Sequence, residues 1–147
     1  MIEYTLKAAS RPAIAWALFA RPSLWHHWAP HVRGAWGLGD SEVRPYSRGV
    51  VRLAGVVPVP VQITTKRPGV SWSWKVGPYE MEHRVKPIGE RACELALSVD
   101  APGPLERAFA LTYGRTIEPL LGRLASASEE LERETPLEEI PLQRAAV

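Results

Sequence analysis

Apolar and polar residues alternate along several short segments of the chain, a pattern typical of β-strands with one buried face. The first segment covers residues 2–7, and from about residue 33 to residue 101 the chain reads as strands, with glycine or proline at the junctions. Because these junctions are short, the pattern predicts an antiparallel meander. The expected strands lie within residues 47–55, 57–67, 70–76, 79–86 and 91–100.

Period-two spacing gives four apolar rows, and we expect all four to face the interior. The rows are Val57, Val59, Val61 and Ile63, continued by Thr65; Val70, Trp72, Trp74 and Val76; Tyr79, Met81, His83 and Val85; and Cys93, Leu95, Leu97 and Val99. Pro58 and Pro60 lack amide donors on the same side of their strand. This absence predicts an exposed sheet edge at this point.

Helical patterns flank the strands. Ser10 and Pro12 read as an N-cap and a helix-starting proline before a short apolar helix, and a second helical turn is expected at about 22–28. A long helix is expected at about 105–133. Spacing at 100° per residue places on its buried face Leu105, Phe109, Tyr113, Thr116, Leu120, Leu124 and Leu131.

Proline also predicts where the long helix bends. Pro119 cannot donate a hydrogen bond to the carbonyl of Arg115, so we expect a bend between residues 114 and 119. After the helix, residues 134–147 show no clear period and are expected to form an extended or poorly ordered tail.

Composition narrows the class of protein. The chain has 147 residues, enough for one domain, and its net charge of +2 includes no basic block of the kind that tracks nucleic acid. Its one cysteine, Cys93, excludes an internal disulfide and fits a reducing compartment. No apolar run approaches the ~20 residues of a membrane-spanning helix, so we expect a cytoplasmic protein without a membrane span.

The order of these elements, together with three motifs, resembles a known family. The motifs are the W-x-x-W-x-P of Trp25, Trp28 and Pro30, the stretch GVSWSWKVG, and the amphipathic LERAFALTYGRTIEPLLGRLASASEELER. They are similar to the polyketide cyclase/dehydrase and lipid-transport branch of the START-like (SRPBCC) superfamily. That family includes lipid and hormone carriers and aromatase/cyclases.

The resemblance implies an α+β helix-grip fold. In this fold a curved antiparallel sheet of about seven strands wraps around a long C-terminal helix, with two short helices after the first strand. A single START-like ligand-binding domain is expected at residues 1–133, followed by the tail at 134–147. The fold encloses a cavity between sheet and helix, and no cofactor is implied.

The interior rows support such a cavity independently. Polar groups lie among their apolar residues, and buried polar groups cost about 1–3 kcal/mol each when they have no partner. Their convergence on one volume indicates a bound ligand or water. The expected ligand-binding residues are Trp72, Trp74, Tyr79, Met81, His83, Phe109, Tyr113 and Thr116. Trp72 and Trp74 either stack on a flat ligand or simply fill the core.

The segment SLWHHWAPHV raises the question of a metal site, since it holds His26, His27 and His31. On a helix His27 and His31 would share one face, as in two-histidine metal grips. However, Pro30 disfavours helical geometry before it, and no carboxylate or thiol lies nearby. We therefore expect no metal. We expect exposed histidines, with the flanking tryptophans anchoring the short helices to the sheet.

The functional hypotheses differ in the role that they give to His83. A neutral imidazole in an apolar pocket could bond a ligand or act as a general base, but it could equally be structural. The first hypothesis is a carrier for a small hydrophobic or aromatic ligand, such as a lipid, an isoprenoid or a polyketide-like molecule. The alternative is an aromatase/cyclase- or dehydratase-type enzyme with His83 as general acid/base. A third is a protein-docking module that uses the edge near Pro58 and Pro60. Homodimerisation is left open.

Overall fold

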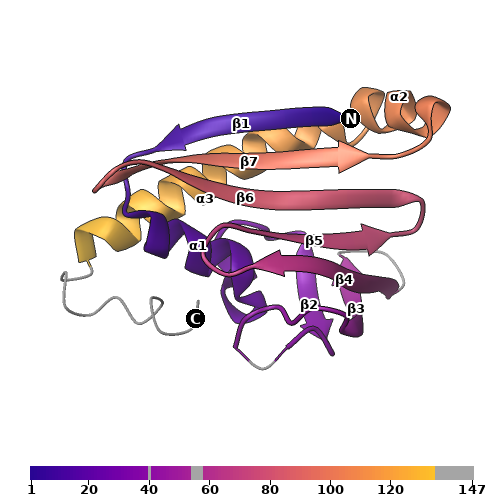
Figure 1. Ribbon diagram of the computed structural model, residues 1–147, viewed down its shortest axis with the longest axis horizontal. Coiled ribbons are helices and arrows are strands. Elements are labelled where there is room, and N and C mark those ends of the chain that lie inside the picture. The colour runs from indigo at the N-terminus through magenta and orange to yellow at the C-terminus, as the bar shows by residue number, and fades with distance from the viewer. Residues whose placement is uncertain (40, 54–57, 135–147) are drawn as a thin grey trace.

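The computed structural model describes residues 1–39, 41–53 and 58–134, and the expected tail therefore lies almost entirely outside the described residues (Figure 1). Its fold is α+β, as predicted. The strands are β1 (Ile2–Ala8), β2 (Val32–Trp36), β3 (Arg48–Leu53), β4 (Val59–Arg67), β5 (Ser71–Val76), β6 (Tyr79–Gly89) and β7 (Ala92–Asp100). The helices are α1 (Pro12–Ala20), the 3₁₀ helix η1 (Pro22–His27), α2 (Gly103–Leu111) and α3 (Gly114–Glu134).

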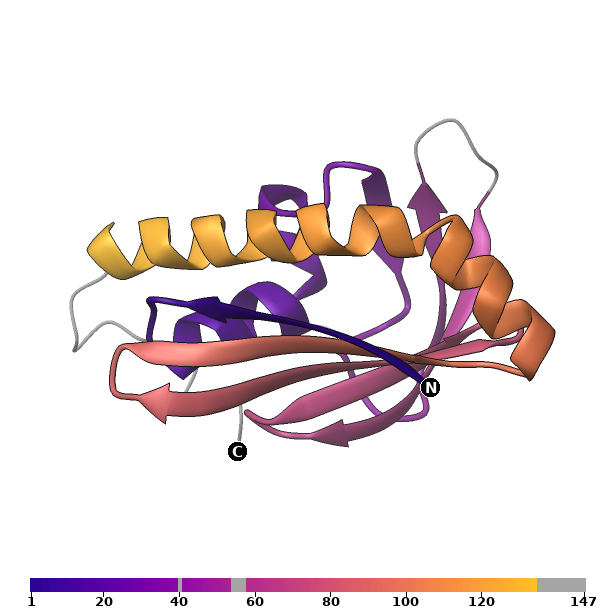
Figure 2. The ribbon, with the colours of Figure 1, turned by 90° about the horizontal axis from the view of Figure 1, so that it is seen from above.

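The described strands form one curved antiparallel sheet in the order β1-β7-β6-β5-β4-β3-β2. Figure 2 shows α3 lying across one face of this sheet, with α1 placed between α3 and the strands toward the C-terminal end of α3. In agreement with this view, α1 contacts α3, β6 and β7. This is the helix-grip arrangement that the sequence motifs implied.

The strand registers confirm most of the predicted rows. Trp72 pairs with His83 across β5 and β6, Trp74 pairs with Met81, and these side chains lie on the face toward α1 and α3. Two positions differ from the prediction. A bulge in β4 between Ile63 and Thr65 turns Thr65 outward, and Val70 lies in the turn before β5, so both are exposed. Val57 lies outside the described residues.

The predicted sheet edge at Pro58 and Pro60 holds only locally. β4 lies between β3 and β5, and the two edges of the sheet are β1 and β2. The pairing of β4 with β5 begins only at Gln62, so the Pro60 end of the strand has β3 as its single neighbour, which makes a missing amide donor tolerable there. Strand β2, which the sequence did not single out, is the true edge at this side.

The C-terminal helix is two helices rather than one. The chain leaves helical geometry at Thr112, where φ is −111° and ψ is −84°, and α3 begins at Gly114. The expected bend between residues 114 and 119 is therefore displaced toward the N-terminus, and α3 continues through Pro119. Pro119 lies in the second turn of α3, where it removes one hydrogen bond, the one to the Arg115 carbonyl, and the helix continues past it.

Two glutamates of α3 hold the start of α1. Ser10 was expected to cap this helix, but its hydroxyl instead lies near Cys93, 3.8 Å from Sγ. The backbone N–H of Arg11 donates to Glu132 at 2.6 Å, and that of Ala9 donates to Glu129 at 2.9 Å. The Arg11 guanidinium also pairs with Glu132 at 3.0 Å, with both side chains more than nine-tenths buried. We call these contacts the α1–α3 latch.

Candidate functional site

The predicted site residues fall into two groups on the inner face of the sheet. Trp72, Trp74 and His83 lie beside α1 and η1, whereas Tyr79, Phe109 and Tyr113 lie at the α2 end. Met81 lies between the groups, since it separates Tyr79 from His83 along β6 and pairs with Trp74. Because alternation along β5 and β6 fixes these positions, the sequence predicted this row correctly.

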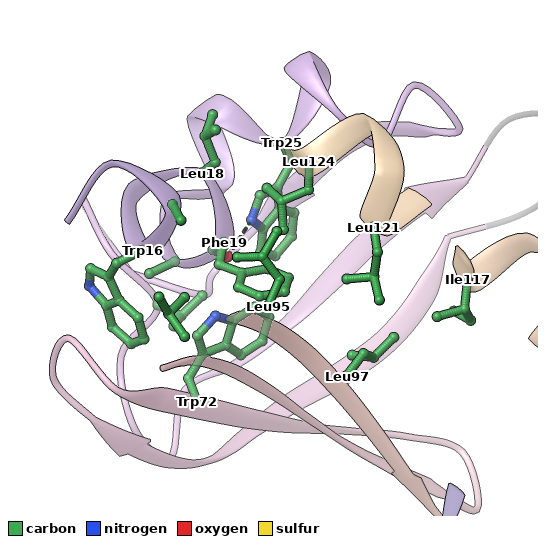
Figure 3. Close-up of a cluster of buried hydrophobic side chains, with 14 of the residues drawn as sticks. Trp16, Leu18, Phe19, Trp25, Trp72, Leu95, Leu97, Ile117, Leu121 and Leu124 are labelled. Carbon is green, nitrogen blue, oxygen red and sulfur yellow. Dashed lines mark hydrogen bonds between the residues drawn. The ribbon is translucent and has the colours of Figure 1, made fainter. Parts of the chain in front are cut away.

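The first group is a packed aromatic cluster, formed by Phe19, Trp25, Trp72, Trp74 and His83. The rings of Trp25 and Trp72 stack with centroids 5.8 Å apart and an angle of 13°, and Phe19 meets His83 edge-on at 5.5 Å. Figure 3 shows Phe19 and Trp25 directed from α1 and η1 toward Trp72 of the sheet. The cluster is therefore the contact by which the short helices attach to the sheet.

His83 is sealed inside this cluster. Its ring stacks on Trp72 with centroids 3.8 Å apart and an angle of 7°, and it is only 5% exposed. Nδ1 lies 3.3 Å from the Trp72 carbonyl oxygen. Burial lowers the pKa of His83 to about 3, against a weaker opposite effect of this hydrogen bond. The imidazole is thus neutral at physiological pH.

The indole N–H groups of the cluster differ in their partners. Trp25 donates to the Phe19 carbonyl at 2.9 Å, and Trp28 donates to the Leu18 carbonyl at 2.7 Å, which fixes η1 against α1. The predicted anchoring to the sheet is made by Trp25, which stacks on Trp72. The N–H groups of Trp72 and Trp74 are buried and have no acceptor among the described residues. A buried donor of this kind is typically matched by water or a ligand atom.

The second group is more open. The Tyr79 and Phe109 rings lie 5.3 Å apart, Phe109 and Tyr113 lie 5.9 Å apart, and the Tyr79 hydroxyl donates to the Leu105 carbonyl at 3.3 Å. Phe109 is buried, but Tyr113 is 63% exposed. These rings join β6 to α2 at the end of the molecule farthest from the α1–α3 latch.

The prediction that Tyr113 and Thr116 lie on the buried face of the helix is wrong. Both are exposed, and the Thr116 hydroxyl donates to the Tyr113 carbonyl of its own helix at 2.7 Å. The reason is the break at Thr112, which resets the helical phase so that the stripe drawn for one continuous helix does not continue. Leu105 is exposed as well. The buried face of α3 consists of Gly114, Ile117, Leu121, Leu124, Ala125 and Ser128.

Much of the expected hollow between sheet and helix is filled. Leu95 and Leu97 of β7 pack beneath Leu121 and Leu124 of α3, beside the aromatic cluster (Figure 3). On β5 and β6, the inner-face side chains that stay only partly buried lie toward the turn that joins the two strands. We call them the open row: Trp74, Val76, Tyr79 and Met81.

A cleft of about 150 Å³ lies between η1 and β2. Trp25, which touches both Trp72 and Trp74, forms part of its wall. The sequence did not point to this cleft because β2 was not predicted. Its lining consists of Pro22, Trp25, His26, Val32, Arg33, Gly34 and Ala35.

The histidine segment is not part of a metal cluster. Within residues 1–39, 41–53 and 58–134, no three His, Cys, Asp or Glu side chains lie close enough together to hold a metal ion. His26, His27 and His31 are exposed, as predicted, and the 3₁₀ helix ends at His27. Over the same ranges, no helix is both long and apolar enough to cross a membrane.

Solved structures share this fold. A START superfamily protein from Mycobacterium smegmatis is 17% identical, with a TM-score of 0.69 over 88% of this chain and 97% of that one. A Mesorhizobium loti protein is 12% identical, with a TM-score of 0.70 over 92% and 100%. The di-domain ARO/CYC StfQ of the steffimycin biosynthetic pathway is 14% identical, with a TM-score of 0.70 over 90% of this chain and 46% of its own.

Curated proteins give no match in sequence. The sequence model of one family, by contrast, matches residues 2–129, which is most of the chain and includes every element that positions the aromatic cluster, the open row and the cleft. This chain therefore belongs to the polyketide cyclase/dehydrase and lipid transport family.

Proposed function

We propose that this protein is a carrier that binds one small hydrophobic or aromatic molecule, such as a lipid, an isoprenoid or a polyketide-like compound, on the inner face of its sheet. The observation that carries the proposal is the open row, whose four apolar side chains α3 leaves partly uncovered. Covering apolar surface of this kind contributes roughly 25 cal/mol per Å². A hydrophobic ligand bound to the open row would cover the apolar surface that the helix leaves exposed.

The ligand would lie between the cleft and the α2 end. Trp25 links the cleft to Trp74, and Met81 and Tyr79 continue the surface toward the ring of Phe109. A cleft of about 150 Å³ is smaller than the roughly 300–1,000 Å³ of typical ligand pockets, so the cleft holds one end of the ligand and the open row the remainder.

One polar contact would orient the ligand. The buried indole N–H of Trp74 has no acceptor among the described residues, although its ring is only partly buried. An oxygen atom of the ligand, from a carbonyl, hydroxyl or carboxylate, would accept this hydrogen bond. Tyr113, whose exposed ring lies beside Phe109, and the exposed Thr116 would contact the ligand only at its outer end.

The surroundings of His83 favour the carrier over the enzyme. With a pKa of about 3, the imidazole is a weak base at neutral pH, and the neighbours within its cluster are aromatic rings rather than carboxylates. The second candidate, a cyclase- or dehydratase-type activity with His83 as general acid/base, draws support from the fold shared with the StfQ ARO/CYC protein. For that chemistry His83 would first have to become accessible.

Titration with a dansyl-labelled fatty acid tests the carrier proposal. We expect saturable binding by the wild-type protein and affinities about five- to thirtyfold weaker for Trp74→Ala and Met81→Ala, since each removes apolar contact worth about 1–2 kcal/mol. Ile88→Ala is the matched control, because Ile88 is an exposed side chain at the opposite end of β6. The proposal fails if the wild type does not saturate or if the three variants bind alike.

His83→Phe separates the two candidates. The substitution keeps a stacked ring and removes both nitrogen atoms. The carrier proposal predicts that fatty-acid binding persists in this variant. If a cyclisation or dehydration of a polyketide-like substrate is found for the wild type and is lost in His83→Phe while binding remains, the enzyme assignment replaces the carrier.

A further inference from the structure

Charge is distributed unevenly along this chain. Among the described residues, positions 1–79 contain ten lysines and arginines and two acidic residues, whereas positions 80–134 contain seven and eleven. The topology keeps this difference in space, because β2 to β5 are neighbours on one side of the sheet and β6, β7 and β1 are neighbours on the other. Strands β2, β3, β4 and β5 contain no acidic residue.

An exposed tryptophan lies on the basic side. Trp36 is 55% exposed at the end of the edge strand β2, and its side chain is on the outer face, where it pairs with Val50. A Cβ built on Gly34 would come within 2.7 Å of the Trp36 ring, so the indole lies flat on the strand at a glycine that leaves room for it. Pro60, opposite Val50 on β4, extends the apolar surface.

Arginines surround this apolar surface. Arg48 and Arg52 stand on the outer face of β3 on either side of Val50, and Arg33 is exposed on β2. Within the part of the chain that the structure describes, none of the three is paired with a carboxylate. We call this surface the Trp36 face: Arg33, Trp36, Arg48, Val50, Arg52 and Pro60.

We propose that the Trp36 face docks the protein onto an anionic phospholipid surface. Tryptophan favours the boundary between acyl chains and headgroups, and arginines beside it pair with lipid phosphates. Each basic side chain near an anionic membrane contributes to attraction, and the acidic opposite side turns the molecule so that this face meets the lipid. A single-stranded nucleic acid fits less well, since it requires several aromatic platforms along a groove.

The position of the Trp36 face suggests why the protein would dock on a membrane, and this step of the argument rests on the proposed carrier function. Arg33 and Gly34 line the cleft between η1 and β2, and the same strand ends in Trp36. A membrane held against the Trp36 face therefore lies beside the cleft. A hydrophobic molecule would pass between bilayer and protein with little exposure to water.

Co-sedimentation with vesicles tests the docking surface. We expect the wild-type protein to bind vesicles of phosphatidylcholine that contain about one quarter phosphatidylglycerol, to ignore pure phosphatidylcholine, and to bind less as salt rises. Trp36→Ala, and Arg48→Glu combined with Arg52→Glu, should each weaken binding about tenfold or more. The control pair, Arg107→Glu with Arg115→Glu, makes the same charge change on exposed positions of α2 and α3 and should bind as the wild type does.

Several outcomes would overturn the proposal. They are equal binding to neutral vesicles, no binding to either kind, an equal loss in the control pair, or tighter binding to a single-stranded oligonucleotide or polyglutamate at the same salt. If the variant with both Arg48→Glu and Arg52→Glu fails to fold, Trp36→Ala and the salt dependence of wild-type binding test the proposal instead. Two variants distinguish the docking proposal from the carrier proposal. Trp36→Ala should still bind the dansyl-labelled fatty acid in the absence of vesicles, and Met81→Ala should still bind vesicles.

Discussion

His83 shows how burial changes the chemistry of a single side chain. It occupies the place of an aromatic core residue, stacked on Trp72 and met edge-on by Phe19. Its pKa in the folded state is lowered to about 3 from an ordinary 6.5. Between these values the unfolded chain binds a proton that the folded protein does not bind. Stability is therefore full above pH 6.5 and declines as the pH falls toward 3.

His83→Phe should remove this dependence. Between pH 7 and pH 5 we expect the wild type to lose about 2 kcal/mol more of its unfolding free energy than the variant does, as measured by urea denaturation at both values. The pKa values of Glu3 and Glu132 are lowered from 4.5, so these groups change the unfolding free energy at lower pH. The pKa of His31 is lowered too, but His31 affects the wild type and the variant equally. An identical pH dependence of the two proteins would contradict the buried, neutral His83.

Alternation along the sequence was sufficient to place His83 on the same face as Trp72 and Trp74, because a strand's period fixes which side chains share a face. Which of the two tryptophans it faces was left open, and the register pairs it with Trp72. It could not show how deeply His83 is buried. That depends on Phe19 and Trp25, which arrive from α1 and η1 and cover the sheet only in the folded chain. Trp36 was overlooked for a related reason, since no alternating segment could be drawn in the glycine-containing stretch around it.

At the level of elements, α3 is fixed differently at its two ends. The latch joins its last turns to Ala9 and Arg11, while at its start Gly114 approaches β1 so closely that a Cβ would lie 2.5 Å from the Tyr4 hydroxyl oxygen. Neither contact has a local signal in the sequence, because each joins residues more than a hundred positions apart. Pro119, the local signal that was visible, does not mark the break.

Glu132→Ala should destabilise the protein strongly. Removing this carboxylate takes away an acceptor that the Arg11 side chain and N–H share, and breaking a buried ion pair costs about 3–5 kcal/mol. Chemical denaturation would measure the loss. Glu130→Ala, an exposed neighbour on the same helix, should change the unfolding free energy by less than about 0.5 kcal/mol. A similar small effect for both variants would show that the latch contributes little.

At the scale of the whole molecule, the order of elements predicted the fold because short connections leave a strand meander few alternatives. The interior was harder to predict. The sequence indicated a hollow between sheet and helix, yet Leu95, Leu97, Leu121 and Leu124 fill one part of it and leave the open row at the other. How far facing side chains interdigitate depends on the register of α3 over the sheet, and the break at Thr112 shifted that register.

The most direct test of the ligand site uses the indole N–H resonances of the six tryptophans, observed by NMR during titration with the dansyl-labelled fatty acid. We predict saturable shifts for Trp74, whose N–H lacks an acceptor among the described residues, and for Trp25, which lines the cleft. Trp16, bonded to Glu42 at 3.1 Å, should keep its resonance. Unmoved Trp74 and Trp25 resonances at saturating fatty acid would contradict the carrier site.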